Sequence, residues 1–263
     1  MGIHDLFTDP CLHSYTNRNL MECTKEKYVS LKSLLNCSVH TLFFEPDRIT
    51  DPAFFQLSDF DSFTELKIVG RERIKNENLK SLLLNCHVSE YVFLSVPIEE
   101  SFQFEIDELK DPKHIEILRG SHWIPAEILL SFKYDYICVF GSPLSMDACY
   151  SFINQWLHSK NTSFFFLLVA WEKEIHPEEM DINRLGVNMM PFDRERRNPL
   201  FRYKHHKQNC YRYKNTAAEM ETGVDFIREE DGLLASIRFN PNALLFCVWH
   251  DRFPNTDNIE FTF

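Results

Sequence analysis

The sequence predicts an α/β fold in which strand–helix units stack side by side on a parallel sheet, followed by a C-terminal antiparallel β element. Three observations support this prediction. The segment LKSLLNC at residues 31–37 returns as LKSLLLNC at residues 79–86, and each copy leads into a β-type stretch. Strand-like segments recur at regular intervals, and a hairpin signal lies near the C-terminus. Because a short repeated unit generally cannot bury its apolar face alone, neighbouring units are expected to stack.

Six strands are expected in the first two thirds of the chain, each rich in β-branched or aromatic residues. They are predicted at residues 39–44, 65–69, 91–96, 114–118, 136–140 and 164–169. Their centres lie roughly 22 to 28 residues apart, which falls within the range of leucine-rich repeats. We therefore expect a leucine-rich-repeat-like array, although the L-x-x-L-x-L-x-x-N pattern is missing and residues 97–107 show no helix pattern.

Helix patterns occupy the segments between the strands. They are predicted at residues 53–57, after the start signal Thr50-Asp51-Pro52, and at residues 76–84, 123–130 and 145–157. In the third, Pro125 is expected at the first helical position, which proline favours. The fourth is the clearest, because Ser145 can cap it and one apolar stripe follows the helical period. The stripe consists of Cys149, Phe152, Ile153, Trp156 and Leu157.

The C-terminal part of the chain predicts a β-hairpin and a third strand. Residues 224–228 and 235–239 flank Asp231-Gly232, a pair typical of tight two-residue turns. Such a turn would place Phe226 opposite Ile237 and Val224 opposite Phe239, so that one face is apolar. Asn240-Pro-Asn then leads into a strand at residues 244–249.

These patterns divide the 263 residues into three parts. Residues 1–30 form an N-terminal extension. Residues 31–175 form the α/β repeat-like array. Residues 176–263 form the C-terminal β region, which contains a basic loop at residues 192–222. The expected division follows the change from a regular strand–helix rhythm to an irregular polar stretch.

Charge and hydropathy restrict the class of protein. The net charge of −11 argues against general affinity for nucleic acid or anionic membranes. Residues 1–9 lack the basic and apolar regions of a signal peptide. The longest apolar run, residues 164–171, is much shorter than the roughly 20 residues that a membrane helix needs. We expect an intracellular protein, cytoplasmic or nuclear, with no membrane association.

The eight cysteines are expected to be reduced and mostly buried. They occur at positions 11, 23, 37, 86, 138, 149, 210 and 247, with no C-x-x-C pair. A structural zinc site therefore has little support. The tightest group of possible ligands is His205, His206 and Cys210, which we do not expect to bind a metal.

No catalytic motif is present, and the prediction is that the protein is not an enzyme and binds no cofactor. The chain has no G-x-G-x-x-G, G-K-[ST], G-x-S-x-G or H-E-x-x-H motif. Only seven glycines are available for a phosphate-binding loop. The pair His250-Asp251 has no accompanying nucleophile motif, so a solvated strand end is the expected role.

Two blocks of sequence resemble a known family. The first runs from Trp123-Ile-Pro-Ala-Glu-Ile-Leu-Leu130 to Phe152-Ile-Asn-Gln-Trp156. The second runs from Asp225-Phe-Ile-Arg-Glu-Glu-Asp-Gly232 to Phe246-Cys-Val-Trp249. Together they resemble the type 2 F-box-associated domain of a large nematode family of F-box proteins. Pro125 and Gln155 depart from that pattern, where Thr and Lys are usual.

The resemblance implies a non-enzymatic protein-protein interaction module, the substrate-recruiting part of an SCF-type ubiquitin ligase adaptor. Its partners would be a protein substrate and ubiquitin-ligase components. The missing F-box implies that the half that joins the ligase is not recognisable in residues 1–30. The tryptophans of the motif are expected to be buried packing residues. The family-motif positions in this chain are Trp123, Ile124, Glu127, Leu129, Leu130, Phe152, Trp156, Asp231, Gly232 and Trp249.

A basic and aromatic stretch at residues 194–214 leaves three interpretations open. It can contact the acidic remainder of the chain, bind an acidic protein partner, or bind single-stranded RNA on its aromatic rings. An internal contact is favoured, and RNA binding is the alternative function. Residues 99–104 form a second candidate loop for partner binding. The basic stretch offers as candidate binding residues Arg196, Arg197, Arg202, Tyr203, Lys204, Tyr211 and Arg212.

Overall fold

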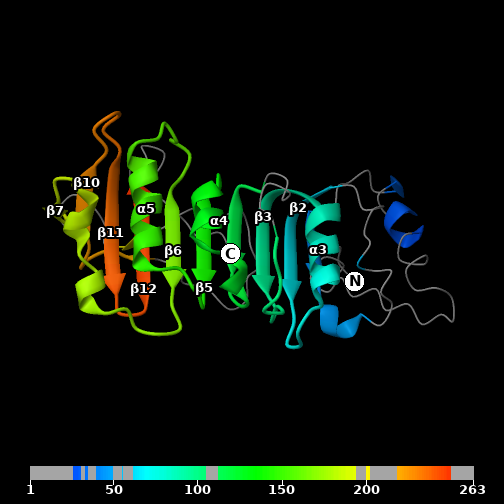
Figure 1. Cartoon of the computed structure of the whole chain (residues 1–263). Coiled ribbons are helices and arrows are strands. Elements are labelled where there is room, and N and C mark those ends of the chain that lie inside the picture. The colour runs from blue at the N-terminus through cyan, green and yellow to red at the C-terminus, as the bar shows by residue number, and fades with distance from the viewer. Residues whose placement is uncertain are drawn as a thin grey trace.

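In the computed structural model, the described residues form a ten-stranded mixed sheet (Figure 1). The structure describes residues 26–30, 33–34, 40–49, 55, 62–104, 112–193, 200–201 and 218–249. The strand order in the sheet is β1-β2-β3-β4-β5-β6-β12-β11-β10-β7. The α/β class and the combination of parallel and antiparallel strands are therefore as predicted.

The parallel part contains the six expected strands in consecutive order. Each strand pairs with the next in parallel, from β1–β2 to β5–β6. Consecutive parallel neighbours require crossover connections, and these return the chain to the same end of the sheet. The strands are β1 (Thr41–Phe44), β2 (Ser62–Val69), β3 (His87–Ser95), β4 (His114–Ile117), β5 (Tyr136–Phe140) and β6 (Phe166–Ala170).

The antiparallel strands continue the same sheet. Strand β12 pairs with β6 over five residues and then with β11, so the C-terminal β element is joined directly to the parallel part. At the far edge lies the two-residue strand β7, which contains Pro191. A separate pair, β8 and β9, forms a second small sheet. These strands are β7 (Met190–Pro191), β8 (Leu200–Phe201), β9 (Ala218–Glu219), β10 (Val224–Ile227), β11 (Leu234–Asn240) and β12 (Ala243–Trp249).

Three described helices lie in front of the sheet in Figure 1: α3 (Asn76–Asn85), α4 (Ala126–Ser131) and α5 (Met146–Leu157). The expected cap of α5 is confirmed, because Ser145 Oγ accepts a hydrogen bond from Ala148 N at 3.2 Å. Short 3-10 helices occur at Pro46–Arg48, Ser121–Trp123, Pro177–Glu179 and Ile182–Leu185.

Two helix predictions need comment. The predicted helix at residues 123–130 is shorter, because Pro125 precedes α4 with extended backbone angles and Trp123 belongs to a 3-10 turn. The residue before a proline avoids the helical region, which separates the two turns. Most of the expected helix at residues 53–57 and most of the first repeat copy at residues 31–37 lie outside the described residues.

The hairpin exists, but its predicted register was wrong by two residues. Val224 pairs with Ile237 and Phe226 with Ala235, so the loop is longer than the expected two-residue turn. Asp231 Oδ1 accepts a hydrogen bond from Leu233 N, and Gly232 N donates to Arg228 O. These bonds form a wider loop in which Gly232 has a φ of 75°. A shift of two residues keeps the apolar side chains on the predicted face.

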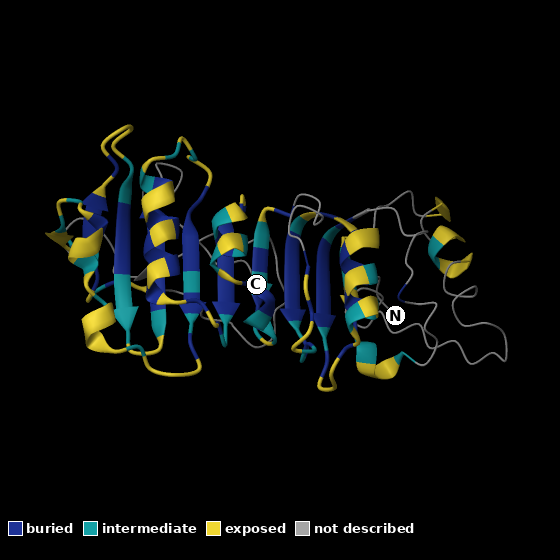
Figure 2. Ribbon diagram, in the orientation of Figure 1, coloured by how far each residue is buried: buried dark blue, intermediate teal, exposed yellow. Residues whose placement is uncertain are grey.

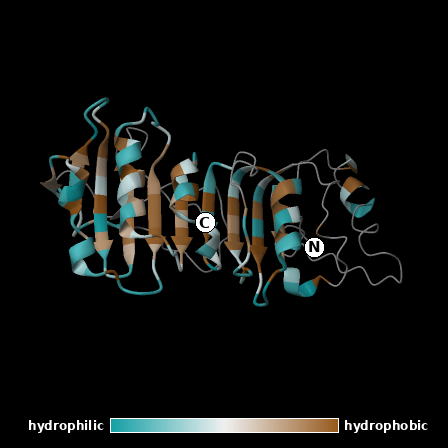
Figure 3. Ribbon diagram, viewed as in Figure 1, coloured by the Kyte–Doolittle hydropathy of each residue, from teal (hydrophilic) through white to brown (hydrophobic). Residues whose placement is uncertain are grey.

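The two faces of the sheet carry separate groups of side chains. On the helix-covered face, strand residues such as Leu66, Val92 and Phe246 join residues of all three helices in one hydrophobic core. Figure 2 shows the buried strands behind helices whose outer sides are exposed, and Figure 3 shows the strands as largely apolar. Alternate strand residues point to the opposite face, on which α3, α4 and α5 do not pack; among the described residues we call it the helix-free face.

Among the described residues, no helix is long and apolar enough to cross a membrane.

Candidate functional site

The family-motif residues fall into buried and exposed groups. Trp123, Ile124, Leu129, Phe152, Trp156 and Trp249 are buried, and Leu130 is partly buried. Glu127, Asp231 and Gly232 are exposed. The three tryptophans lie at separate places: before α4, on α5 and on β12. They do not converge on a common site.

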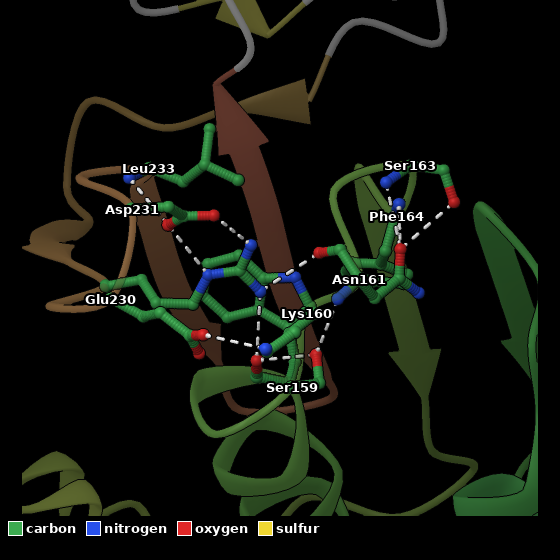
Figure 4. A network of polar contacts seen from close by, with 10 residues as sticks. Ser159, Lys160, Asn161, Ser163, Phe164, Glu230, Asp231 and Leu233 are labelled. Carbon is green, nitrogen blue, oxygen red and sulfur yellow. Dashed lines mark hydrogen bonds and ion pairs between the residues drawn. The ribbon is translucent and has the colours of Figure 1, made fainter.

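Arg228 joins the C-terminal hairpin to the end of α5 and is fully buried. Its Nε and Nη2 donate to the two carboxylate oxygens of Asp231, at 2.9 and 2.5 Å. Its Nη1 donates to the backbone oxygens of Trp156, at 3.1 Å, and Asn161, at 2.9 Å. Its guanidinium lies 4.4 Å from the centre of the Trp156 ring. Figure 4 shows Asp231 beside the loop that contains Ser159 and Asn161.

This network is a structural contact rather than an open site. The planar guanidinium donates hydrogen bonds from its edge and stacks on an aromatic ring with its flat face. A lysine ammonium cannot make both kinds of contact. The Trp156 carbonyl lies at the C-terminal end of α5, where a positive charge is favourable. The hydrogen bond from Arg228 is the main cause that lowers the pKa of Asp231. We conclude that three of the family-motif positions, Trp156, Asp231 and Gly232, hold the hairpin against α5.

The helix-free face carries ionisable groups on β1 to β4, at one end of the sheet. We call Thr41, Glu65, Lys67, Tyr91 and Glu116 the polar cluster. Lys67 Nζ lies 3.0 Å from Glu65 Oε2, and Thr41 Oγ1 donates to the same oxygen at 2.9 Å. Across β3 and β4, Tyr91 OH donates to Glu116 Oε2 at 2.7 Å.

The polar cluster is largely removed from water. The exposed fractions are 2% for Glu65, 2% for Tyr91 and 8% for Lys67. Desolvation raises the pKa of Glu116, and this effect exceeds the opposite effects of the Tyr91 hydrogen bond and the Lys67 charge. Buried charges of this kind contribute little to folding, since their desolvation cost offsets their attraction. A buried carboxyl group with a perturbed pKa, such as that of Glu116, is instead typical of functional sites.

The sequence prediction did not identify the polar cluster as a site. The segments E-L-K-I in β2 and H-I-E-I in β4 alternate charged and apolar residues, which indicates a strand face that is not part of an apolar core. That signal places the charged residues on one face. It does not show that β2, β3 and β4 are adjacent, which depends on the tertiary fold.

Towards β10, the helix-free face contains a second buried polar group. Ser236 Oγ donates to Asp225 Oδ1 and accepts a hydrogen bond from Trp249 Nε1 at 2.7 Å. Cys247 Sγ lies 3.8 Å from Met220 Sδ in the same region. Trp249 therefore anchors this side of β12 with a buried hydrogen bond as well as apolar contact.

Of the two segments expected to bind a partner, one lies outside the described residues and the other lies within them. Arg196, Arg197, Arg202, Tyr203, Lys204, Tyr211 and Arg212 all lie outside the described residues. In the candidate loop at residues 99–104, Phe102 and Phe104 are buried and pack edge-on against Trp123. Glu100, Ser101 and Gln103 of this loop are exposed, so its use by a partner stays a prediction.

The four described cysteines, Cys86, Cys138, Cys149 and Cys247, are free and buried. Burial raises the pKa of Cys86 and of Cys149 to about 12, and raises the pKa of Cys138 and Cys247 as well. These thiols therefore stay protonated and weakly nucleophilic at neutral pH. Within the described parts of the chain, no group of His, Cys, Asp or Glu is arranged to hold a metal ion. His205, His206 and Cys210 lie outside those parts.

Comparison with known proteins found no matching family model, no matching curated protein and no matching solved structure.

Proposed function

We propose that the protein is a non-enzymatic protein-interaction module whose helix-free face is the recognition surface. By its sequence resemblance, it would be the substrate-recruiting part of an SCF-type ubiquitin ligase adaptor. The consecutive parallel strands β1–β6, with helices α3, α4 and α5 on one side, support a leucine-rich-repeat-like array. Such arrays use their extended sheet surfaces for binding.

The polar cluster is the observation that carries this proposal. Glu65 and Lys67 on β2 and Glu116 on β4 flank β3 near the β1 edge of the sheet, where apolar residues would stabilise the fold better. The motif residues around Arg228, in contrast, make contacts within the protein. The polar cluster is largely buried, so a partner that recognises it would first have to displace the side chains that cover it.

Affinity capture of the tagged full-length chain tests the proposal. We expect ubiquitin-ligase components together with a substrate protein among the captured proteins. A variant with Glu65→Gln and Lys67→Met should keep its near-UV circular dichroism and lose the substrate. The control variant, Asp147→Asn with Arg184→Gln, neutralises an exposed ion pair on the other side of the molecule and should capture the same substrate.

Two outcomes would contradict this function. If the double variant of Glu65 and Lys67 captured the same proteins in the same amounts, the helix-free face would not be the recognition surface. If capture depended on intact RNA and was lost after nuclease treatment, the basic stretch at residues 194–214 would bind RNA instead.

A further inference from the structure

Glu116 is the acidic member of the polar cluster that is only half-buried. Glu65 and Lys67 on β2 are buried, whereas part of the Glu116 side chain on β4 stays accessible. Lys67 Nζ pairs with Glu65 at 3.0 Å, and within the described part of the chain Glu116 takes part in no ion pair of this kind. The one ammonium group of the polar cluster is thus held by Glu65, and the carboxyl group of Glu116 has no cation of its own.

The side chains directly beside Glu116 on the sheet are neutral. The pairing registers place Phe93 of β3 on one side of it and Cys138 of β5 on the other. Burial raises the pKa of Cys138, so its thiol carries no charge at neutral pH. Lys67 lies on β2 beyond Phe93, at two strand spacings or about 10 Å. The two adjacent side chains therefore neither neutralise Glu116 nor repel a cation that approaches it.

We propose that Glu116 binds a cationic side chain of the partner, an arginine or a lysine, on the helix-free face. This inference rests on the proposed function, because it names the chemistry of the group that the recognition surface would accept. Glu116 Oε2 accepts a hydrogen bond from Tyr91 OH, and among the described residues no second donor contacts the carboxyl group. A guanidinium or ammonium group at Oε1 would supply that donor as a charge-assisted hydrogen bond.

An anionic or an apolar group would fit this place less well. An anion would meet the carboxyl groups of Glu65 and Glu116, while the ammonium group of Lys67 is buried in its pair with Glu65. An apolar group would remove the remaining water from Glu116 and offer no hydrogen bond, which is unfavourable for a polar group. A cation would balance the charges instead, because the two carboxyl groups of the polar cluster would then have two cations.

Binding of a cation would be coupled to the loss of a proton from Glu116. Desolvation raises the pKa of Glu116 and favours its neutral form, whereas a nearby positive charge favours the ionised form. A cationic partner should therefore bind more tightly at neutral pH than at acidic pH. Among the described residues, the titratable groups around Glu116 on this face are Lys67, Tyr91, His114, Tyr136 and Cys138.

Nuclear magnetic resonance of the full-length chain with isotope-labelled Glu carboxyl groups tests the inference. The Glu116 signal is identified by its absence from the Glu116→Gln variant. N-acetyl-arginine amide and N-acetyl-lysine amide serve as cationic probes, and neutral N-acetyl-citrulline amide is the control of similar shape. We expect a cationic probe to lower the titration midpoint of Glu116 by about one pH unit or more. The citrulline probe at equal ionic strength should leave it unchanged.

Exposed Glu127 is the internal reference and should titrate at the same pH with every probe. An unchanged Glu116 midpoint with both cationic probes would overturn the inference. An equal change with the citrulline probe would overturn it as well, because the charge would then have no part in binding. This measurement uses no partner, so its result does not depend on the proposed function.

Affinity capture separates the two proposals from the other side. Glu116→Gln keeps the size of the side chain and removes its charge, so it should lower the amount of captured substrate about tenfold. Glu127→Gln is the matched control and should capture as much substrate as the parent chain. If the variant of Glu65 and Lys67 lost the substrate and Glu116→Gln retained it, the helix-free face would still be the recognition surface, but it would not bind a cation at Glu116.

Discussion

Folding buries the carboxyl group of Glu116, and this burial disfavours the charged form of the side chain. Its carboxylate accepts one hydrogen bond from Tyr91 and lies near the Lys67 charge, but the loss of water dominates. The folded protein therefore favours the protonated form more than the unfolded chain does. This preference links the stability of the protein to pH.

Replacing Glu116 by Gln should stabilise the protein at neutral pH. The raised pKa means that Glu116 contributes stability below the ordinary pKa of a Glu, and that this contribution is lost as the pH rises through the folded value. Glutamine can still accept the Tyr91 hydrogen bond without carrying charge. Urea unfolding should show a gain for Glu116→Gln at pH 7 that disappears below about pH 4.

The matched control for this variant is Glu127→Gln, which neutralises an exposed Glu on α4. It should leave the free energy of unfolding nearly unchanged at both pH values. A loss of stability for Glu116→Gln at pH 7 would contradict the assignment, because it would mean that the charged carboxylate stabilises the fold.

Trp156 packs between Arg228 and Phe246, and its indole N–H has no hydrogen-bond partner among the described residues. Trp156→Ala should lower the free energy of unfolding by about 3–5 kcal/mol, because it removes a large buried ring. Trp156→Phe keeps an aromatic face beneath Arg228 and should cost less than about 1.5 kcal/mol. Equal losses for both variants, measured by chemical unfolding, would show that the indole N–H matters more than the ring.

For single residues, the sequence identified important positions more successfully than it identified their roles. The motif tryptophans are buried, as expected of packing residues. Arg228 was predicted only as part of a strand, because its partners Trp156 and Asn161 lie far away in the chain. The polar cluster was missed for the same reason, since its members come from four different strands.

Among the elements, the C-terminal hairpin shows how a side chain can override a turn preference. Asp231-Gly232 favours a two-residue turn, but the Asp231 carboxylate binds Arg228 and Leu233 N instead. The loop widens so that Arg228 can reach the carbonyl of Trp156 at the end of α5. Local turn chemistry could not predict this outcome, because it depends on a contact 72 positions away in the sequence.

Arg228→Lys should separate the hairpin from α5. A lysine ammonium cannot contact both oxygens of Asp231 and the carbonyls of Trp156 and Asn161 together. We expect a loss of about 3 kcal/mol or more in the free energy of unfolding, because a buried charge loses most of its partners. Hydrogen exchange should show faster opening of β10 and β11 than of β3 in this variant.

Arg184→Lys is the control for that substitution. Arg184 is half-exposed and pairs with Asp147 at 2.6 Å on the surface. Its replacement should cost less than about 1 kcal/mol. If Arg228→Lys were equally mild, Arg228 would not hold the two elements together.

Strand prediction was more successful than helix prediction in this chain. All six predicted parallel strands and the three predicted C-terminal strands are present. Their boundaries differ from the predicted ones by only a few residues. Their regular spacing and β-branched or aromatic residues made them recognisable. The helix near residue 125 was overpredicted, because proline fits both a first helical turn and the extended residue before it.

At the scale of the whole molecule, the predicted array and the predicted C-terminal β element form one continuous ten-stranded sheet in the described residues. Strand β12 returns antiparallel beside β6, and five residue pairs join the two parts. One hydrophobic cluster extends from Phe44 on β1 to Val248 on β12. The expected boundary after residue 175 marks a change of strand direction, which residue patterns alone do not distinguish from a domain boundary.

The continuous core predicts a single unfolding transition for the described part of the sheet. Urea titrations followed by circular dichroism and by tryptophan fluorescence should coincide. Phe246 is fully buried and contacts Trp156, Phe164 and Phe226, so Phe246→Ala should lower the entire transition by about 3–5 kcal/mol. Two separate transitions, with only one shifted by the substitution, would show that the parallel and antiparallel strands unfold independently.

The two edge strands of the sheet, β1 and β7, differ in their chemistry. At one end, β7 has two residues, and Pro191 has no backbone N–H to offer. At the other end, β1 carries the exposed ring of Phe43. A fibril grown by edge-to-edge strand addition requires two receptive borders on every molecule. In the described part of the sheet, the short β7 edge with its proline gives a further strand little to pair with, so growth by that route would be blocked at this border.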